Sequence, residues 1–212
     1  MMKRRICILL MVLSGITSLT AQNMKSVFVA MPDSLTPLLT RVNKEDCIDF
    51  LESNMKAVVK NRVDNEAEMK VLTDDYLLMQ TSAVGTLEMK LLPLSDSVKV
   101  VCMVRTVCAS ACDSEVKFYS SDWKEELDAR ALLTLPAADA FFLPGDSLSE
   151  EAQPVRKMAD MNLMKASLSQ EDTSLTFVYT TPDYLSQEDR EKLSSLLRKE
   201  PLVRRWTNGK YQ

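Results

Sequence analysis

The sequence contains no histidine among its 212 residues. Ser-His-Asp and Cys-His catalysis both use an imidazole as the general base, so this chain can build neither. Zinc sites that depend on imidazole ligands are excluded for the same reason. An enzyme of this sequence would have to use a Ser-Lys pair, a pair of carboxylates or an all-oxygen cation site.

Glycine is also scarce, with four residues in the whole chain. Gly85, Gly145 and Gly209 lie far apart, and the fourth falls in the apolar start of the sequence. The phosphate-binding loops of Rossmann and P-loop proteins need several closely spaced glycines. The sequence therefore argues against nucleotide binding through such a loop, and we expect neither a cofactor nor a metal site.

No apolar run reaches the length of about 20 residues that a membrane-spanning helix needs. The longest covers residues 6–16, follows three basic residues and precedes the polar stretch TSLTAQ. This order is typical of a secretory leader. We therefore expect a signal peptide over residues 1–21 and export to the periplasm, the cell surface or the extracellular medium. The mature chain would have no transmembrane segment.

Acidic residues outnumber basic ones, 30 to 26, and three of the basic residues lie in the predicted leader. Nucleic-acid binding depends largely on Lys and Arg that neutralise phosphates, so an acidic chain argues against that class of partner. Hydrophobic residues make up 46% of the sequence, which is enough to form a core rather than a disordered chain.

The mature chain begins with a proline-rich approach to a predicted helix. Asn43 stands at the expected N-cap, with Glu45 and Asp46 in the first turn, where acidic side chains favour the helix dipole. The residues expected to face the core recur at helical spacing: Cys47, Ile48, Leu51 and Met55.

Short runs rich in β-forming residues follow, separated by polar turns. The predicted strands are 57–63, 67–73, 76–82, 86–94, 98–108 and 115–120. Such short links favour an antiparallel meander, because parallel strands need long crossovers. The region 124–136 fits either a short helix or an extended edge.

The second half predicts a hairpin over residues 164–181, a helix that begins at Ser186, and a last edge strand near residues 203–206. Met158, Met161 and Met164 lie three apart and are expected to fill the core rather than form an adaptable groove. The predicted fold is α+β: an antiparallel β-meander sheet packed by an N-terminal and a C-terminal helix. Residues 22–212 form one domain, with two related sub-lobes, 22–123 and 124–212, as an open alternative.

Cys108 and Cys112 flank a predicted tight turn at the end of an apolar strand. Zinc usually takes two close pairs of ligands, and thioredoxin-type chemistry uses Cys-x-x-Cys at a helix start, so both fit poorly. A disulfide across the turn fits an oxidising compartment. Cys102 lies on a predicted buried strand face and Cys47 on a predicted helix face, and their pairing stays open because four cysteines allow three pairings.

Four segments carry a resemblance: DDYLLMQTS, EMKLLPLSDS, TVCASACDS and FYSSDW. In this order behind a leader, they resemble a family of small secreted proteins from Bacteroidetes that is defined as a domain of unknown function. The resemblance implies an envelope or secreted location. It implies no activity and provides no catalytic residues.

The hypothesis favoured by the sequence is a non-catalytic binding or accessory module of the cell envelope, whose partner is an unknown envelope protein or a small ligand. The predicted binding face consists of four aromatic side chains: Tyr76, Phe118, Tyr119 and Trp123. The alternative is a hydrolase-type enzyme that uses a Ser-Lys pair or converging carboxylates, with Asp74, Asp75 and Asp113 as candidates. A structural or inhibitory protein is a third class.

Overall fold

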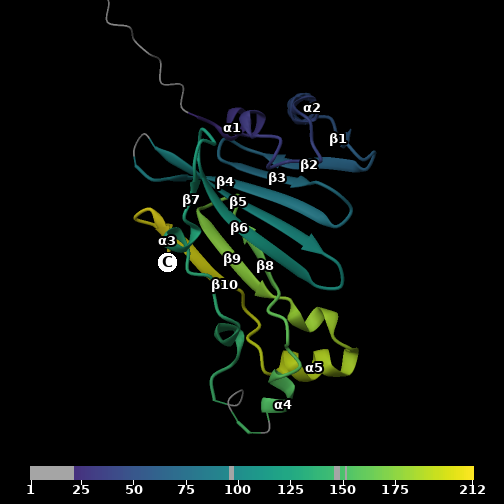
Figure 1. Ribbon diagram of the computed structural model, residues 1–212, viewed down its shortest axis with the longest axis vertical. Helices are drawn as coiled ribbons and strands as arrows, with labels where there is room; N and C mark the ends of the chain where they lie inside the picture. The colour runs from purple at the N-terminus through teal and green to yellow at the C-terminus, as the bar shows by residue number, and fades with distance from the viewer. Residues whose placement is uncertain (1–21, 96–97, 146–148, 151) are drawn as a thin grey trace, which may run out of the picture.

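Three layers make up the protein in the computed structural model, which describes residues 22–95, 98–145, 149–150 and 152–212. The helices α1 (Met24–Ala30) and α2 (Arg41–Glu52) form the first layer, a seven-stranded sheet the second and a four-stranded sheet the third (Figure 1). All strand pairs within both sheets are antiparallel, which confirms the α+β class. The predicted leader, residues 1–21, lies outside the described residues.

The seven-stranded sheet is the predicted meander, because its strands are neighbours in chain order. The strands are β1 (Ala57–Lys60), β2 (Glu66–Leu72), β3 (Tyr76–Gln80), β4 (Gly85–Pro93), β5 (Lys99–Cys108), β6 (Cys112–Ser120) and β7 (Glu126–Leu127). A register shift between Met69 and Val71 marks a bulge in β2. The bulge turns Val71 to the opposite face from Met69, so β2 contributes to both cores.

The helix α2 begins three residues earlier than predicted, because Thr40 and not Asn43 is its N-cap. The Thr40 hydroxyl accepts from the Asn43 N–H at 3.0 Å, and the Asn43 side chain accepts in turn from the Thr40 N–H at 3.0 Å. Asn43 therefore completes a reciprocal capping box from inside the helix. The helix α1, capped by Asn23, was absent from the sequence prediction.

A helix-side core lies between α1, α2 and one face of the large sheet. Of the predicted α2 residues, Cys47 and Ile48 are buried in it, Leu51 is half-buried and Met55 is exposed. Met55 lies beyond the end of the helix, so the helical spacing that suggested burial does not extend to it.

The four-stranded sheet has the order β11-β10-β9-β8. Its strands are β8 (Met164–Leu168), β9 (Ser174–Tyr179), β10 (Leu202–Thr207) and β11 (Lys210–Tyr211). The pair β8–β9 is the predicted hairpin. The strand β10 lies inside the sheet rather than at its edge, because Asn208 and Gly209 adopt φ of 53° and 77° and turn the chain back as β11.

An inter-sheet core fills the space between the two sheets. It contains Cys102, Phe118, Phe177, Trp206 and Tyr211, among other buried residues. The rings of Phe118, Trp206 and Tyr211 form a cluster with centroid distances of 5.2–6.1 Å. Both faces of the central strands are therefore covered, one by helices and one by a second sheet.

The smaller elements connect the sheets and extend the molecule beyond the four-stranded sheet. They are α3 (Ala129–Leu132), η1 (Ala138–Phe141), α4 (Gln153–Arg156), η3 (Thr181–Tyr184) and α5 (Gln187–Ser195). The region predicted as either helix or edge contains both β7 and α3. The helix α5 begins after Ser186, as predicted, but packs against η3 and α4 and does not lie on the large sheet (Figure 1).

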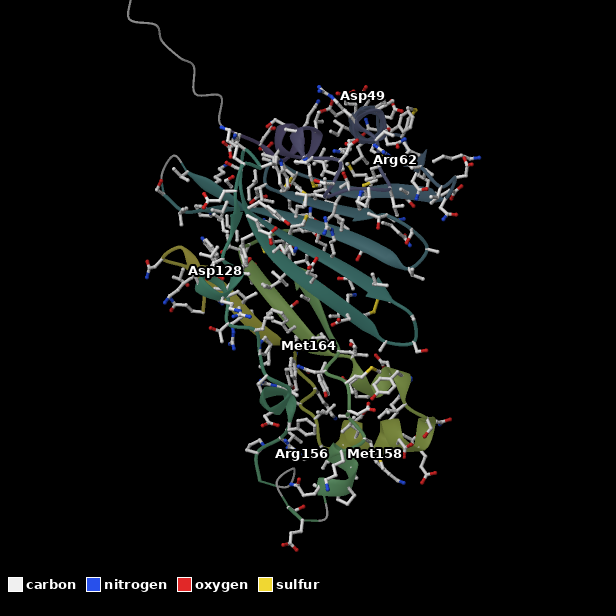
Figure 2. The ribbon with its side chains drawn as sticks, viewed as in Figure 1. Asp49, Arg62, Asp128, Arg156, Met158 and Met164 are labelled. Atoms are coloured by element: carbon white, nitrogen blue, oxygen red, sulfur yellow. A yellow bond between two sulfur atoms is a disulfide. The ribbon has the colours of Figure 1, made fainter. Side chains whose placement is uncertain are left out.

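Of the predicted methionine stripe, Met164 packs against the inter-sheet core, whereas Met158 and Met161 do not. Met158 and Met164 are half-buried and lie apart from each other (Figure 2), and Met161 is 46% exposed. The chain between α4 and β8 is irregular, so a spacing of three residues does not place these side chains on one face there.

Candidate functional site

The four aromatic residues predicted to form a binding face lie in two different cores. Tyr76 and Phe118 are buried in the inter-sheet core, whereas Tyr119 is buried in the helix-side core and Trp123 packs against it. The Trp123 Nε1 donates to the Val27 carbonyl oxygen at 2.8 Å. Because Phe118 and Tyr119 are neighbours on a strand, they face opposite sides of a sheet whose two sides are both covered. The four side chains do not form a common exposed face, which corrects the prediction.

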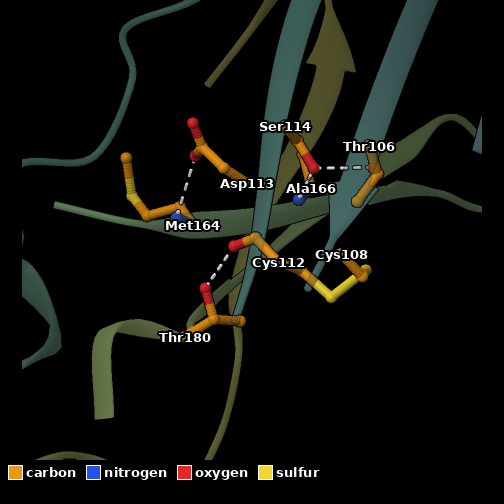
Figure 3. The surroundings of a disulfide bond; sticks show 8 residues. All are labelled: Thr106, Cys108, Cys112, Asp113, Ser114, Met164, Ala166 and Thr180. Atoms are coloured by element: carbon orange, nitrogen blue, oxygen red, sulfur yellow. Dashed lines mark hydrogen bonds between the residues drawn. A yellow bond between two sulfur atoms is a disulfide. The ribbon is translucent and has the colours of Figure 1, made fainter. Parts of the chain in front are cut away.

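The structure contains the predicted disulfide between Cys108 and Cys112 (Figure 3). The two residues are directly opposite each other in the β5–β6 register, with their Cα atoms 4.0 Å apart. Cys47 and Cys102 are free and buried. Burial raises the pKa of the Cys47 thiol to about 11, and it also raises the pKa of the Cys102 thiol.

The disulfide hairpin supports the edge strand of the small sheet. The Met164 N–H donates to Asp113 Oδ1 at 3.2 Å, and the Ala166 N–H donates to Ser114 Oγ at 2.9 Å (Figure 3). The Thr180 hydroxyl donates to the Cys112 carbonyl oxygen. Side chains of β6 thus satisfy edge N–H groups of β8 that no strand pairs. The Asp113 carboxylate is therefore engaged in a contact that holds β8 against β6.

A buried ionisable cluster that the sequence prediction missed lies between the sheets. Glu88, 6% exposed, accepts from the Leu168 N–H at 2.8 Å and from the Tyr76 hydroxyl at 3.3 Å. Lys90, 1% exposed, lies 2.9 Å from Asp75 Oδ2 and donates to the Gln170 carbonyl oxygen at 3.0 Å. The sequence feature that could have revealed this cluster is the pair of charged residues, Glu88 and Lys90, at alternate positions of the otherwise apolar strand EMKLL.

The electrostatics of this cluster follow from burial. Burial raises the pKa of the Glu88 carboxyl, while hydrogen bonds from Leu168 and Tyr76 act in the opposite direction. Burial and the neighbouring Glu88 raise the pKa of the Tyr76 hydroxyl. Perturbed groups of this kind can mark an active site. Here Glu88 accepts from Leu168 and Lys90 donates to Gln170, and both of these contacts join the two sheets, whereas the contacts with Tyr76 and Asp75 stay within the large sheet. The cluster is therefore a structural feature.

The carboxylates proposed for the alternative enzyme do not converge. Asp75 pairs with Lys90. In the sheet, Lys90 is opposite Cys102 of β5, and Cys102 is opposite Phe118 of β6, so Asp75 lies at the level of Phe118. Asp113 lies five residues before Phe118, which is about 17 Å along the strand. Asp74 belongs to the same turn as Asp75, so it is equally remote from Asp113.

The other chemistries considered for an enzyme have no counterpart in the described part of the chain. No hydrogen bond there joins a serine hydroxyl to a lysine amine. Lys44, the other buried lysine, donates to the Met31 carbonyl oxygen at 2.5 Å, and burial lowers its pKa. No group of three or more Cys, Asp or Glu side chains with the geometry of a metal site occurs among these residues.

A hollow of about 280 Å³ opens where the loop 34–39 meets the ends of β3, β4 and β5. Leu35, Leu38, Leu87 and Val107 contribute to its apolar wall. Two contacts hold the loop in place: Leu39 is buried in the helix-side core, and the Leu38 carbonyl oxygen accepts from the Arg62 N–H at 2.9 Å. Val107 is 60% exposed, so the wall includes an apolar side chain open to solvent.

The hollow contains one charged side chain among the described residues that line it, Arg105. Arg105 lies opposite Leu87 in the β4–β5 register, and its Nη2 donates to the Leu35 carbonyl oxygen. Its Nη1 lies 3.6 Å from Glu115 Oε2, in a partly exposed ion pair. Thr36 also lines the hollow, and its buried hydroxyl has no hydrogen-bond partner in the described structure.

A family of proteins of unknown function, DUF3256, matches residues 16–211. The chain belongs to the DUF3256 family. The match covers most of the described structure and agrees with the resemblance to a domain of unknown function. No match was found among curated proteins.

A solved structure is similar to this DUF3256 chain: a domain of an uncharacterized protein from Porphyromonas gingivalis W83. The two share 29% sequence identity at a TM-score of 0.77, over 88% of this chain and 96% of that chain. The source of that domain is a Bacteroidetes bacterium, as the resemblance implied. None of the described helices of the DUF3256 chain has the length and apolar character needed to cross a membrane.

Proposed function

We propose that this DUF3256 protein is an exported, non-catalytic binding or accessory module of the bacterial cell envelope, and that the hollow beside the loop 34–39 is its ligand site. The leader-like start of the sequence supports export. The disulfide Cys108–Cys112 also supports it, because disulfides persist in oxidising compartments. We further propose that residues 22–212 act as one unit.

The hollow is the single observation that carries the binding role. Ligand sites are concave and mostly apolar, with a small number of polar groups that orient the ligand. The hollow combines an apolar wall with Arg105 and the unpaired Thr36 hydroxyl. By contrast, Glu88, Lys90 and Asp113 are all engaged in contacts between the two sheets, and this argues for binding rather than hydrolysis.

The test compares two valines on exposed strand positions. Val107→Glu places a carboxylate on the wall of the hollow, and Val203→Glu makes the same change on β10, where Val203 is 43% exposed and outside the hollow. The full-length chain and both variants would be expressed in a Bacteroidetes host. The envelope and cytoplasmic fractions would be separated, and each protein purified for native mass spectrometry.

We expect the wild type and Val203→Glu to occur in the envelope or medium without residues 1–21 and to carry the same bound component. Val107→Glu should be exported equally but lack that component. An uncleaved chain retained in the cytoplasm would refute export. Equal binding by Val107→Glu would refute the hollow as the ligand site.

A further inference from the structure

The size and surface of the hollow limit the class of ligand. Its volume of about 280 Å³ is just below the range of about 300–1,000 Å³ for small-molecule sites, which favours a small ligand. The side chains of Leu35, Leu38, Leu87 and Val107 provide the apolar contacts. A short aliphatic body would bury its surface against them, which is favourable because apolar surface leaves water.

The polar groups of the hollow favour an anionic end on that ligand. The guanidinium of Arg105 has five N–H donors, of which one binds the Leu35 carbonyl oxygen and others face Glu115. Glu115 is 54% exposed, and an exposed ion pair is weak, so a carboxylate in the hollow competes for this guanidinium at low cost.

The hydroxyl of Thr36 adds a second, independent indication. Thr36 is 5% exposed and its Oγ1 atom has no partner among the described residues. A buried hydroxyl without a partner is costly, and most such groups in proteins are hydrogen-bonded. The Thr36 Oγ1 atom is closed off from solvent, so the hydroxyl meets a ligand only when the threonine side chain turns toward the hollow. A carboxylate oxygen would then accept from this hydroxyl, whereas an aliphatic group would leave it unpaired.

We propose that the hollow binds an aliphatic monocarboxylate, with Arg105 and Thr36 contacting the carboxylate and the apolar wall contacting the chain. This inference rests on the proposed function, because it assigns a ligand class to the same site. Octanoate is a suitable probe, and 1-octanol is its uncharged control.

The experiment is a titration of the protein, purified after expression of the full-length chain, with octanoate and with 1-octanol. Binding would be measured by calorimetry and by the shifts of the backbone amide signals of Leu35, Leu87 and Val107. We expect octanoate to bind at these residues about tenfold or more tightly than 1-octanol, since hydrogen bonds to charged groups are the stronger kind.

Three variants assign the contacts. Arg105→Gln should weaken octanoate binding about tenfold or more and leave 1-octanol unchanged, and Thr36→Val should weaken octanoate by a smaller factor. The matched control is Lys117→Gln, because Lys117 also pairs with Glu115 but does not line the hollow. Thermal melts and amide spectra would confirm folding, and Arg105→Lys, which keeps the charge, should retain part of the affinity.

The outcomes separate the two proposals. Equal binding of octanoate and 1-octanol, or full octanoate affinity in both Arg105→Gln and Thr36→Val, would refute carboxylate recognition while the hollow remains a ligand site. No shift of the hollow amides with either compound would also refute the proposed ligand class. The proposed function would then depend on whether Val107→Glu loses the component bound in the native host.

Discussion

Replacing Glu88 tests whether the buried cluster joins the two sheets. Glu88→Ala would leave the Leu168 N–H and the Tyr76 hydroxyl without an acceptor in a buried position. Each unsatisfied donor costs about 1–3 kcal/mol, and removal of a buried carboxylate recovers part of that cost. We expect the free energy of unfolding to fall by about 2–4 kcal/mol.

The assay is urea unfolding followed by circular dichroism, with the disulfide kept oxidised. The matched control is Glu115→Ala, which removes an exposed carboxylate from a strand of the same sheet and should cost less than about 1 kcal/mol. Equal effects of the two substitutions would refute the structural role of Glu88.

The pH dependence of Glu88→Gln tests the electrostatic part of the same reasoning. Burial raises the pKa of Glu88 in the folded protein above its unfolded value of about 4.3, so the folded state binds this proton more tightly. The stabilisation by the protonated form is present below the unfolded pKa and is lost as pH rises through the folded pKa. Glutamine is neutral throughout, so Glu88→Gln should gain stability relative to the wild type as the pH rises above the unfolded pKa. A constant difference over this rise in pH would contradict the raised pKa.

Three further predictions concern the disulfide, the free thiols and the inter-sheet core. The double variant Cys108→Ser/Cys112→Ser should lose about 2 kcal/mol, because the closed loop is short, as measured by urea unfolding; a loss near zero would contradict its role as a staple. Cys47 and Cys102 should react with an aromatic disulfide reagent at pH 8 only after unfolding, since both are buried with raised pKa values; rapid reaction in the native protein would contradict this. Phe118→Ala should cost about 3–5 kcal/mol in urea unfolding, and a loss under 1 kcal/mol would show that the small sheet is not packed on it.

The sequence was sufficient to predict features that depend on neighbours in the chain. Alternation along β5 correctly placed Cys102 on a buried face, and the short polar links correctly predicted a meander. The N-cap of α2 was misassigned because Thr40 and Asn43 both have capping side chains, and only the geometry shows which residue lies outside the helix. Threonine and asparagine are both favoured at the N-cap, so residue type alone does not decide between Thr40 and Asn43.

The aromatic binding face failed for a different reason. The prediction assumed that one face of the meander is open, and under that assumption some of its aromatic side chains would be exposed. In β5, however, residues 100–104 are all buried, which means that both faces are covered. The continuous apolar run VVCMV was the available signal, because strands buried on two faces lose their polar alternation. Glu88 and Lys90 obscured that signal on β4, where contacts with the small sheet and the ion pair of Lys90 with Asp75 compensate the burial of their charges.

The hollow arises because the ends of β4 and β5 extend beyond the part of the large sheet that the first layer covers. Leu87 is buried under the helix-side layer, and the facing strand carries Arg105 opposite it. Val107 lies two residues farther along β5 on the same face, beyond the cover that the anchored loop 34–39 provides. The path of that loop depends on the burial of Leu39 and on the hydrogen bond from Arg62 to Leu38, which are tertiary contacts without a local sequence signature. The strand β5 could therefore be predicted from the sequence. The hollow at its end could not, because it depends on how far the loop 34–39 covers the sheet.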